Sequence, residues 1–330
     1  MKRALTFPWL VGFISFCATC VLIHHLAPLE IDVITPKLAF LRQHQAEFDT
    51  IFVGSSRLYQ GLSPRIFDEE MRRAGFRTRS FNQSANGLLS PESLMMVRTI
   101  SAMRLRSLRR IFLEISRLRE LDHFQGATPR DVYWHDFQAL KYAARKLFHD
   151  LADPSERQEF STHGRLWAMN EMNLGRVHEA IFGAKIVNQK LLPLGVDGDG
   201  FAPVAKTIKP PQQKKLQDML EQIRAGTWKI HKTDEVHRRE LALLQNELAR
   251  QNIALIFVAT SSLRERGAKN DLPAGAALLD FEDPVEFATL YADRHRVDAD
   301  HLNAEGAVQF SRIFAQRFAQ QIALGSKGFE

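Results

Sequence analysis

The stretch Thr50-Ile-Phe-Val-Gly-Ser-Ser-Arg57 joins a short apolar run to a turn of small polar residues. Short runs of β-branched and aromatic residues are typical of a buried strand. Gly54 and the two serines end this run, and a helical pattern begins soon afterwards at Pro64. The stretch therefore predicts a strand that delivers a serine to a strand-to-helix turn.

Similar apolar runs recur along the chain and alternate with helical patterns. Such alternation builds a mostly parallel sheet that is covered by helices on both faces. The predicted fold is therefore α/β, with three layers in the order helix, sheet, helix. Further strands are predicted at 77–81, 109–115, 253–260 and 276–281, and helices at 64–74, 91–108 and 234–251.

The clearest helix follows Asn303, whose side chain can cap its first turn. Apolar residues then repeat on one stripe: Ala307, Phe310, Phe314, Phe318 and Ile322. A stripe of this spacing marks a helix that packs one face against a core. We expect this helix to close the domain, which comprises residues 37–116 and 233–324.

Residues 117–232 interrupt the alternation. A structureless loop of this length is improbable inside a compact domain. We therefore expect an inserted, largely helical subdomain or lid. Its Asp197-Gly-Asp-Gly run lacks the further acids of a calcium loop and predicts a turn.

The N-terminus predicts a membrane anchor in residues 1–30. Lys2 and Arg3 precede Ala4–Ile23, which holds 20 uncharged residues, 15 of them apolar. Twenty helical residues span roughly 30 Å, the thickness of a bilayer's hydrocarbon core. We expect a transmembrane helix at about 4–23, with the N-terminus in the cytoplasm and the rest of the chain outside. A cleaved signal peptide is the alternative.

Composition excludes several classes of protein. With 45% apolar and 25% charged residues, the 330-residue chain is ordinary globular protein. The net charge of +6 comes without a dense basic run, so we expect no nucleic-acid partner. Both cysteines, Cys17 and Cys20, lie in the first apolar segment, which permits an oxidising compartment without requiring one. The histidines show no metal-ligand spacing, so we expect neither a metal nor another cofactor.

Candidate chemistry lies at the carboxyl ends of the strands, where open parallel sheets place their sites. Ser56 follows the first strand, and Asp298 precedes His301 by three residues in a loop before the last helix. A serine hydroxyl is a weak nucleophile that needs a base, and a carboxylate can orient that base. We predict Ser56 as nucleophile, His301 as general base and then acid, and Asp298 as the group that orients it.

These residues give the chain a resemblance to the SGNH, or GDSL-type, hydrolases, and to their membrane-anchored relatives that O-acetylate envelope polysaccharides. Gly54-Ser-Ser56 matches that family's Gly-Asp-Ser block, and Asp298-Ala-Asp-His-Leu-Asn-Ala-Glu-Gly306 contains its Asp-x-x-His block in full. Asn82 and Gly87 match parts of a second block. The resemblance implies an SGNH-type, flavodoxin-like sheet, with the backbone N–H groups of Ser56 and Gly87 as oxyanion donors.

One block departs from the family pattern. The family places Gly-x-Asn-Asp after the third strand, whereas this chain has Glu114-Ile-Ser-Arg117. The amide that would donate to the oxyanion is absent, and one such donor is worth about 10²–10³ in rate. Asn82 and Ser116 are candidates for an additional oxyanion donor or for a structural role.

The resemblance implies a serine esterase or O-acyltransferase, with acetyl as the expected acyl group. It would act on an envelope carbohydrate at the periplasmic face of a bacterial inner membrane, beside a membrane acyl-donor protein. The alternative is a non-catalytic scaffold that binds glycan or an assembly partner through a degenerate site. Activity that depends on Ser56 and His301 would distinguish the two.

Overall fold

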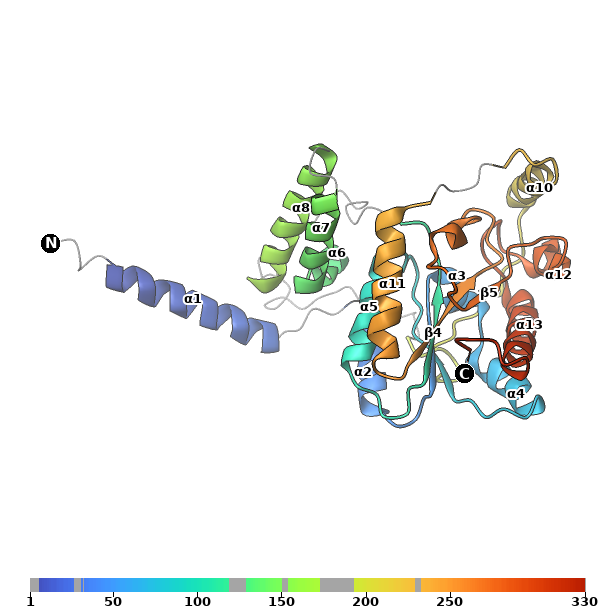
Figure 1. Cartoon of the computed structure of the whole chain (residues 1–330), viewed down its shortest axis with the longest axis horizontal. Coiled ribbons are helices and arrows are strands. Elements are labelled where there is room, and N and C mark those ends of the chain that lie inside the picture. The colour runs from blue at the N-terminus through green and yellow to red at the C-terminus, as the bar shows by residue number, and fades with distance from the viewer. Residues whose placement is uncertain are drawn as a thin grey trace. The chain divides into compact units, whose positions relative to one another are not determined.

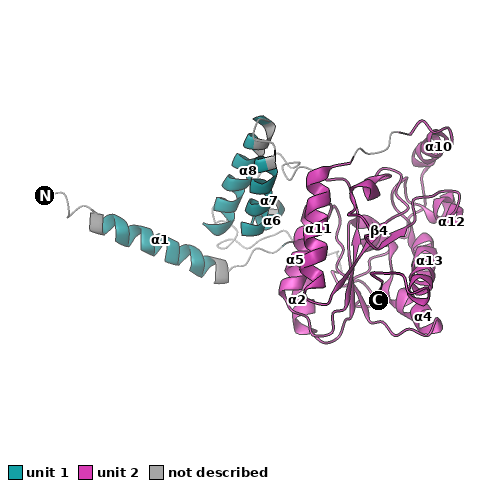
Figure 2. Ribbon diagram, in the orientation of Figure 1, with its two compact units in different colours: residues 1–32, 120–191 teal, residues 33–119, 192–330 magenta. Residues whose placement is uncertain are grey.

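A computed structural model describes residues 6–26, 31, 33–118, 129–149, 154–172, 193–228 and 233–329. The chain forms two compact units (Figure 2). Unit 1 comprises residues 1–32 and 120–191, and unit 2 comprises residues 33–119 and 192–330. The sheet and every predicted site residue belong to unit 2.

Unit 2 is built on a five-stranded, all-parallel sheet in the order β2-β1-β3-β4-β5. This is the doubly wound order in which the chain crosses over on both sides of β1. The predicted α/β class and all five predicted strands are confirmed. The strands are β1 (Thr50–Val53), β2 (Ser80–Asn82), β3 (Arg110–Glu114), β4 (Ala254–Ala259) and β5 (Leu278–Asp280).

Helices cover both faces of the sheet (Figure 1). On one face lie α4 (Pro64–Arg73) and α13 (Ala304–Ala323); on the other lie α5 (Glu92–Ala102) and α11 (Glu235–Ala249). The remaining helices of unit 2 are α2 (Ile34–Gln43), α3 (Ser56–Gly61), α10 (Pro210–Arg224), α12 (Ala288–Tyr291) and the 3₁₀ turns η1 (Ala268–Asp271) and η2 (Asp293–His295). This arrangement is the predicted three-layer fold.

Phenylalanine rings fix α13 to the sheet. Phe52 of β1 and Phe112 of β3 are register partners, and their rings stack at 5.1 Å. Phe314 of α13 lies edge-on to both rings, and Phe318 packs on Phe112. All four side chains are completely buried, and burial of each contributes about 2–3 kcal/mol. Because α13 cannot shift on this core, the loop that precedes it is also held in place.

Unit 1 contains α1 (Thr6–Leu26), α6 (Pro129–Trp134), α7 (Phe137–His149) and α8 (Pro154–Glu171). The thiol of Cys20 in α1 lies 3.3 Å from the carbonyl oxygen of Met172, just after α8. A search of the described residues for a helix with the length and apolarity of a membrane span returned none. Residues 1–5 and 27–30 of the predicted anchor region lie outside the described residues.

The structure differs from two predicted boundaries. The helix predicted over 91–108 ends at Ala102, because the backbone of Arg104 is left-handed, with a φ of 53°. The predicted insertion over 117–232 includes residues 192–232, which belong to the unit of the sheet. The parts of that insertion at 119–128, 150–153, 173–192 and 229–232 lie outside the described residues.

A buried lysine ties the end of β2 to a later turn. The Nζ of Lys37 donates to the carbonyl oxygens of Asn82 and Ser84 at 2.7 Å and of Gly200 at 2.8 Å. Gly200 has a φ of +85°, and a Cβ there would lie 2.1 Å from the Asn82 oxygen. Burial holds the pKa of Lys37 well below its usual value, while Asp199 opposes this shift. The lysine therefore fixes the segment that leads from β2 to the predicted oxyanion turn.

We expect Lys37→Met to destabilise unit 2 by about 3 kcal/mol, because three buried carbonyl oxygens would lose their donor. Urea unfolding of the full-length chain in neutral detergent measures the change. Lys214→Met is the matched control, because Lys214 is exposed and its ion pair within the described part of the chain is with Asp218 on its own helix. Equal stability of the two variants would contradict the role assigned to Lys37.

Candidate active site

Ser56 lies at the topological switch point of the sheet. β1 ends at Val53, and Ser56 is the first residue of α3. Ser55 caps this helix, since its hydroxyl oxygen accepts from the N–H of Arg57 at 3.3 Å. The chain leaves β1 for β2 on one side and returns to β3 on the other, and folds of this class bind ligands at the carboxyl ends of the two strands that flank such a reversal. The predicted nucleophile therefore lies where this fold class binds its ligands.

Three predicted residues come together at this point. The Oγ of Ser56 lies 2.7 Å from Nε2 of His301. The other ring nitrogen, Nδ1, lies 2.9 and 3.0 Å from the two carboxylate oxygens of Asp298. A proton on Nδ1 leaves Nε2 free to accept the hydroxyl proton, which is the tautomer that a general base requires. Residues 245 positions apart in sequence thus form a serine–histidine–aspartate arrangement.

Asp298 stays ionised in this setting. Its partial burial would raise the pKa of the carboxyl, but hydrogen bonds from the His301 ring and from the backbone N–H groups of Asp300 and His301 lower it to about 2. The two backbone donors lie at 2.8 and 2.9 Å. Asp298 therefore presents a fixed negative charge to the imidazole.

The loop that carries His301 is clamped from several sides. The guanidinium of Arg296 is completely buried and donates to the carbonyl oxygens of Leu290, Ala299 and Ser261 at 2.6–3.0 Å. Asn303 caps α13 by accepting from the N–H of Gly306 at 2.9 Å, as predicted. These contacts hold the imidazole in position before any substrate binds.

The predicted oxyanion donors lie on neighbouring segments. The N–H of Ala85 donates to the Gly54 oxygen at 3.0 Å, and Nε2 of Gln60 in α3 donates to Oδ1 of Asn86 at 3.1 Å. These contacts hold the turn before Gly87 against the segment that carries Ser56. Gly87 itself has a φ of +68°, which glycine adopts without strain. The oxyanion role of the Ser56 and Gly87 N–H groups stays a prediction.

Asn82 and Ser116 are engaged elsewhere. Nδ2 of Asn82 donates to the carbonyl oxygens of Leu58 and Leu62, at 2.8 and 2.9 Å. Both amide hydrogens therefore hold α3 in place, and neither is left for an oxyanion. The Oγ of Ser116 accepts from the N–H of Ser90 at 2.9 Å, and the side chain is buried.

A buried charge network under Ser56 was not predicted from the sequence. Oε2 of Glu114, at the end of β3, accepts from the N–H of Ser55 at 2.6 Å, and Oε1 accepts from Nε of Arg57. Arg57 also lies 3.5 Å from Glu265. The sequence does contain a signal for this contact. Gly54 directly follows β1, and Glu114 ends β3, the strand that pairs with β1.

The network continues to the histidine loop. Nη1 of Arg57 donates to the hydroxyl of Ser262 at 3.4 Å, and that hydroxyl donates to Asp300 at 2.9 Å. The N–H of Asp300 in turn donates to Asp298. A chain of buried polar contacts therefore joins the Ser56 turn to the loop of His301.

A second serine–histidine–aspartate arrangement lies in the interior. The hydroxyl of Ser90 is 2.8 Å from Nε2 of His237, and Nδ1 of that ring is 3.1 Å from Asp271. The side chains of all three residues are buried, with at most 3% exposed. No substrate reaches a serine in this position, so we assign these residues a structural role at the start of α11.

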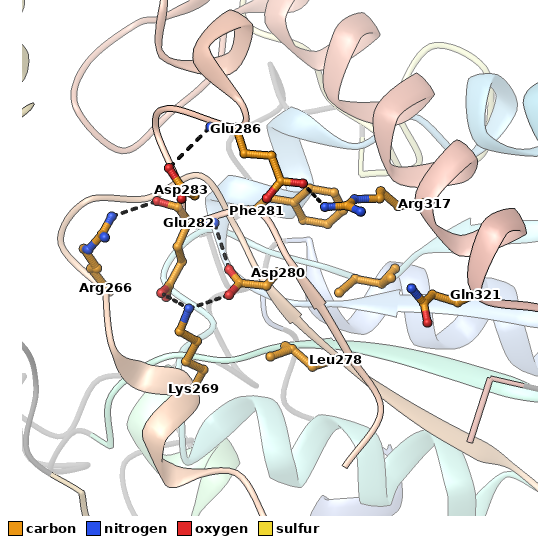
Figure 3. Close-up of a pocket in the computed structure, with 11 residues that line it drawn as sticks. Arg266, Lys269, Leu278, Asp280, Phe281, Glu282, Asp283, Glu286, Arg317 and Gln321 are labelled. Carbon is orange, nitrogen blue, oxygen red and sulfur yellow. Dashed lines mark hydrogen bonds and ion pairs between the residues drawn. The ribbon is translucent and has the colours of Figure 1, made fainter. Parts of the chain in front are cut away.

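A separate hollow of about 320 Å³ lies beside β5 (Figure 3). Lys269 pairs there with Asp280 and with Glu282, and Arg317 pairs with Glu286. None of the three predicted catalytic residues lines it. Neighbouring carboxylates match Lys269 and Arg317, and Arg266 donates to the carbonyl oxygen of Glu282, so we assign the hollow no part in the chemistry at Ser56.

The described residues hold no group of three His, Cys, Asp or Glu side chains that could bind a metal ion. No protein-family model matches the chain, and a search of curated proteins finds no similar sequence.

We expect Gly54→Ala to destabilise the protein by at least about 2 kcal/mol, because the added Cβ would lie 2.5 Å from Oε2 of Glu114 and 2.9 Å from Leu58. Gly61→Ala is the matched control, since a Cβ there meets only Leu302, at 3.7 Å. Urea unfolding of both variants measures the difference. If Gly54→Ala unfolds at the wild-type urea concentration, Glu114 does not pack over this turn as described.

The low pKa of Asp298 predicts a specific acid sensitivity. Its stabilising contribution is present above the unfolded pKa of about 4 and is lost as the pH falls through about 2. Between pH 5 and pH 2 we expect the wild type to lose about 1–2 kcal/mol more stability than Asp298→Asn. Thermal unfolding at both pH values measures this loss. Identical losses would mean that the carboxylate is not stabilised by these contacts.

Proposed function

We propose that this protein is a serine-dependent acyl-transfer enzyme of the SGNH type. The observation that carries the proposal is the contact of Ser56 Oγ with His301 Nε2, with Asp298 on the opposite ring nitrogen. Ser56 stands at the first turn of a helix at the switch point of the sheet, and the histidine loop is clamped independently. The weak nucleophile therefore contacts a base, and the base contacts an ionised group that orients it. Acyl transfer by a serine requires this succession of contacts.

The reaction proceeds through an acyl-enzyme. Nε2 of His301 takes the hydroxyl proton as Ser56 Oγ attacks the acyl carbonyl, and the carbonyl oxygen becomes an oxyanion. The imidazolium, stabilised by Asp298, then gives that proton to the departing alkoxide as the bond to the leaving group breaks. In the second half, His301 deprotonates the acceptor hydroxyl, which attacks the acyl-serine, and Ser56 regains its proton. Water as acceptor gives an esterase and a sugar hydroxyl gives a transferase.

The proposal places this chemistry at the outer face of a bacterial inner membrane. The apolar Ala4–Ile23 segment, preceded by Lys2 and Arg3, supports a signal anchor with the N-terminus in the cytoplasm. The resemblance to envelope O-acetylation proteins supports an acetyl group, a carbohydrate acceptor and a membrane acyl-donor partner.

A non-catalytic glycan-binding or assembly scaffold is the second candidate. It is favoured by the absence of a carboxamide in Glu114-Ile-Ser-Arg117 and by the engagement of both Asn82 amide hydrogens with α3. An oxyanion site with only backbone donors would be slow. Kinetics on the purified chain separates a slow enzyme from a scaffold.

We expect the full-length chain in neutral detergent to hydrolyse p-nitrophenyl acetate, and Ser56→Ala and His301→Gln each to reduce the rate at least about 10³-fold. Ser90→Ala is the matched control, because it removes the serine of the interior arrangement. Circular dichroism checks that each variant is folded. A folded wild type that is no faster than Ser56→Ala would favour the scaffold. Analysis of the acetylated product after adding oligosaccharide then distinguishes transferase from esterase.

A further inference from the structure

Because the strands are parallel, arginines that are far apart in the sequence lie at one edge of the sheet. Segments 42–50, 72–80, 103–110 and 250–253 lead into β1, β2, β3 and β4, so they meet at the amino ends of the strands. Together they contain ten arginines, no lysine and two acidic residues. We call these four segments the amino-edge patch. It lies at the edge of the sheet opposite Ser56.

Most guanidinium groups of the amino-edge patch are open to solvent and unmatched. Arg77, Arg104, Arg106 and Arg109 are exposed, and no ion pair forms at these four among the described residues. Arg79 does pair with Glu47. The local charge is therefore strongly positive although the whole chain carries only +6.

The centre of the amino-edge patch is a hollow of about 550 Å³ lined by Arg79, Arg106 and Arg109. Its two carboxylates already have partners: Glu47 contacts Arg79 and His44, and Asp49 accepts from the hydroxyl of Thr50. The three guanidinium groups outnumber the two carboxylates around the hollow, and Arg106 and Arg109 form no ion pair among the described residues.

Backbone contacts hold these arginines in place. The N–H of Arg106 donates to the Gln45 oxygen and the N–H of Arg109 to the Asp49 oxygen, both at 2.9 Å. The hydroxyl of Ser107 donates to the Ala46 oxygen, also at 2.9 Å. The loop is therefore fixed through its main chain, and its guanidinium groups stay free for a ligand.

We propose that the amino-edge patch binds an anionic polymer whose charges are phosphate groups. The planar guanidinium fork matches two phosphate oxygens at once, which explains the use of arginine without lysine. Several separate arginines around an open hollow suit a chain of charges better than one small anion. The hollow has no aromatic side chain on which bases could stack, so recognition rests on phosphate alone.

The chain enters unit 2 at the edge of the sheet opposite the amino-edge patch. Nε2 of Gln83, just after β2, lies 3.4 Å from the Ile34 oxygen at the start of α2. The chain therefore enters unit 2 at the carboxyl edge of the sheet, and α2 leads from there to the amino-edge patch. An anchor upstream of residue 33 connects to the edge that carries Ser56. The proposal does not depend on acyl transfer.

Binding of fluorescent inorganic polyphosphate to the full chain in neutral phosphatidylcholine nanodiscs tests the proposal. We expect Arg106→Gln/Arg109→Gln to weaken binding at least about 10-fold and to reduce the slope of log K against log salt by about 1–2. Arg238→Gln/Arg239→Gln removes the same charge from the start of α11, at the other edge, and should bind as the wild type does. Thermal unfolding confirms that both double variants are folded.

Further binding measurements define the chemical class of the ligand. Arg106→Lys/Arg109→Lys keeps the positive charge but removes the planar guanidinium groups. We therefore expect this variant to bind polyphosphate more weakly than the wild type and more tightly than the glutamine variant. Polyglutamate of equal charge should bind several-fold more weakly than polyphosphate. Equal loss in the two glutamine double variants would overturn the site. The proposed ligand class would be wrong if the protein bound added phosphatidylglycerol vesicles more tightly than polyphosphate. It would also be wrong if the protein bound single-stranded DNA more tightly than polyphosphate of equal charge.

Discussion

The Ser56 turn depends on the hydrogen bond and the ion pair that the carboxylate of Glu114 forms. It ends β3 beside the end of β1, accepts from the backbone of Ser55, and pairs with Arg57 inside the protein. A buried carboxylate needs such partners, and removing one of them from a buried pair typically costs about 3–5 kcal/mol. Gly54 lets Glu114 approach closely enough to make these contacts. The helix that begins at Ser56 is therefore positioned by a neighbouring strand as well as by its own cap at Ser55.

The same interaction reaches the other half of the candidate site. Arg57 contacts Ser262, which donates to Asp300 in the loop of His301. The phenylalanine core then fixes α13 and closes that loop from behind. The Glu114–Arg57 network and the phenylalanine core thus act together on serine and histidine, whose Oγ and Nε2 atoms lie 2.7 Å apart. Preorganisation of this kind is what acyl transfer needs from a protein.

The features of the fold and of the site that depend on a local pattern of residues could be predicted from the sequence. The five strands, the capped last helix and the Asp298-x-x-His301 loop follow from apolar periodicity, capping residues and spacing, and these patterns also identified Ser56. The helix ends at Ala102, and the prediction ran on to residue 108 because Leu105 and Leu108, which are buried beyond that end, mimic a helical stripe. The role of Glu114 and the gathering of arginines at the amino edge depend on strand order. Neither can be derived from neighbouring residues in the sequence.

The central claim is that Ser56, among several serines near histidine or glutamate, is the nucleophile. Fluorophosphonate labelling of the wild-type chain, followed by peptide mass spectrometry, tests it most directly. A phosphonate adduct forms only on a serine whose hydroxyl is activated and accessible. The account predicts one adduct, on Ser56. An adduct on Ser55 or Ser90, or no adduct on folded protein, would contradict it.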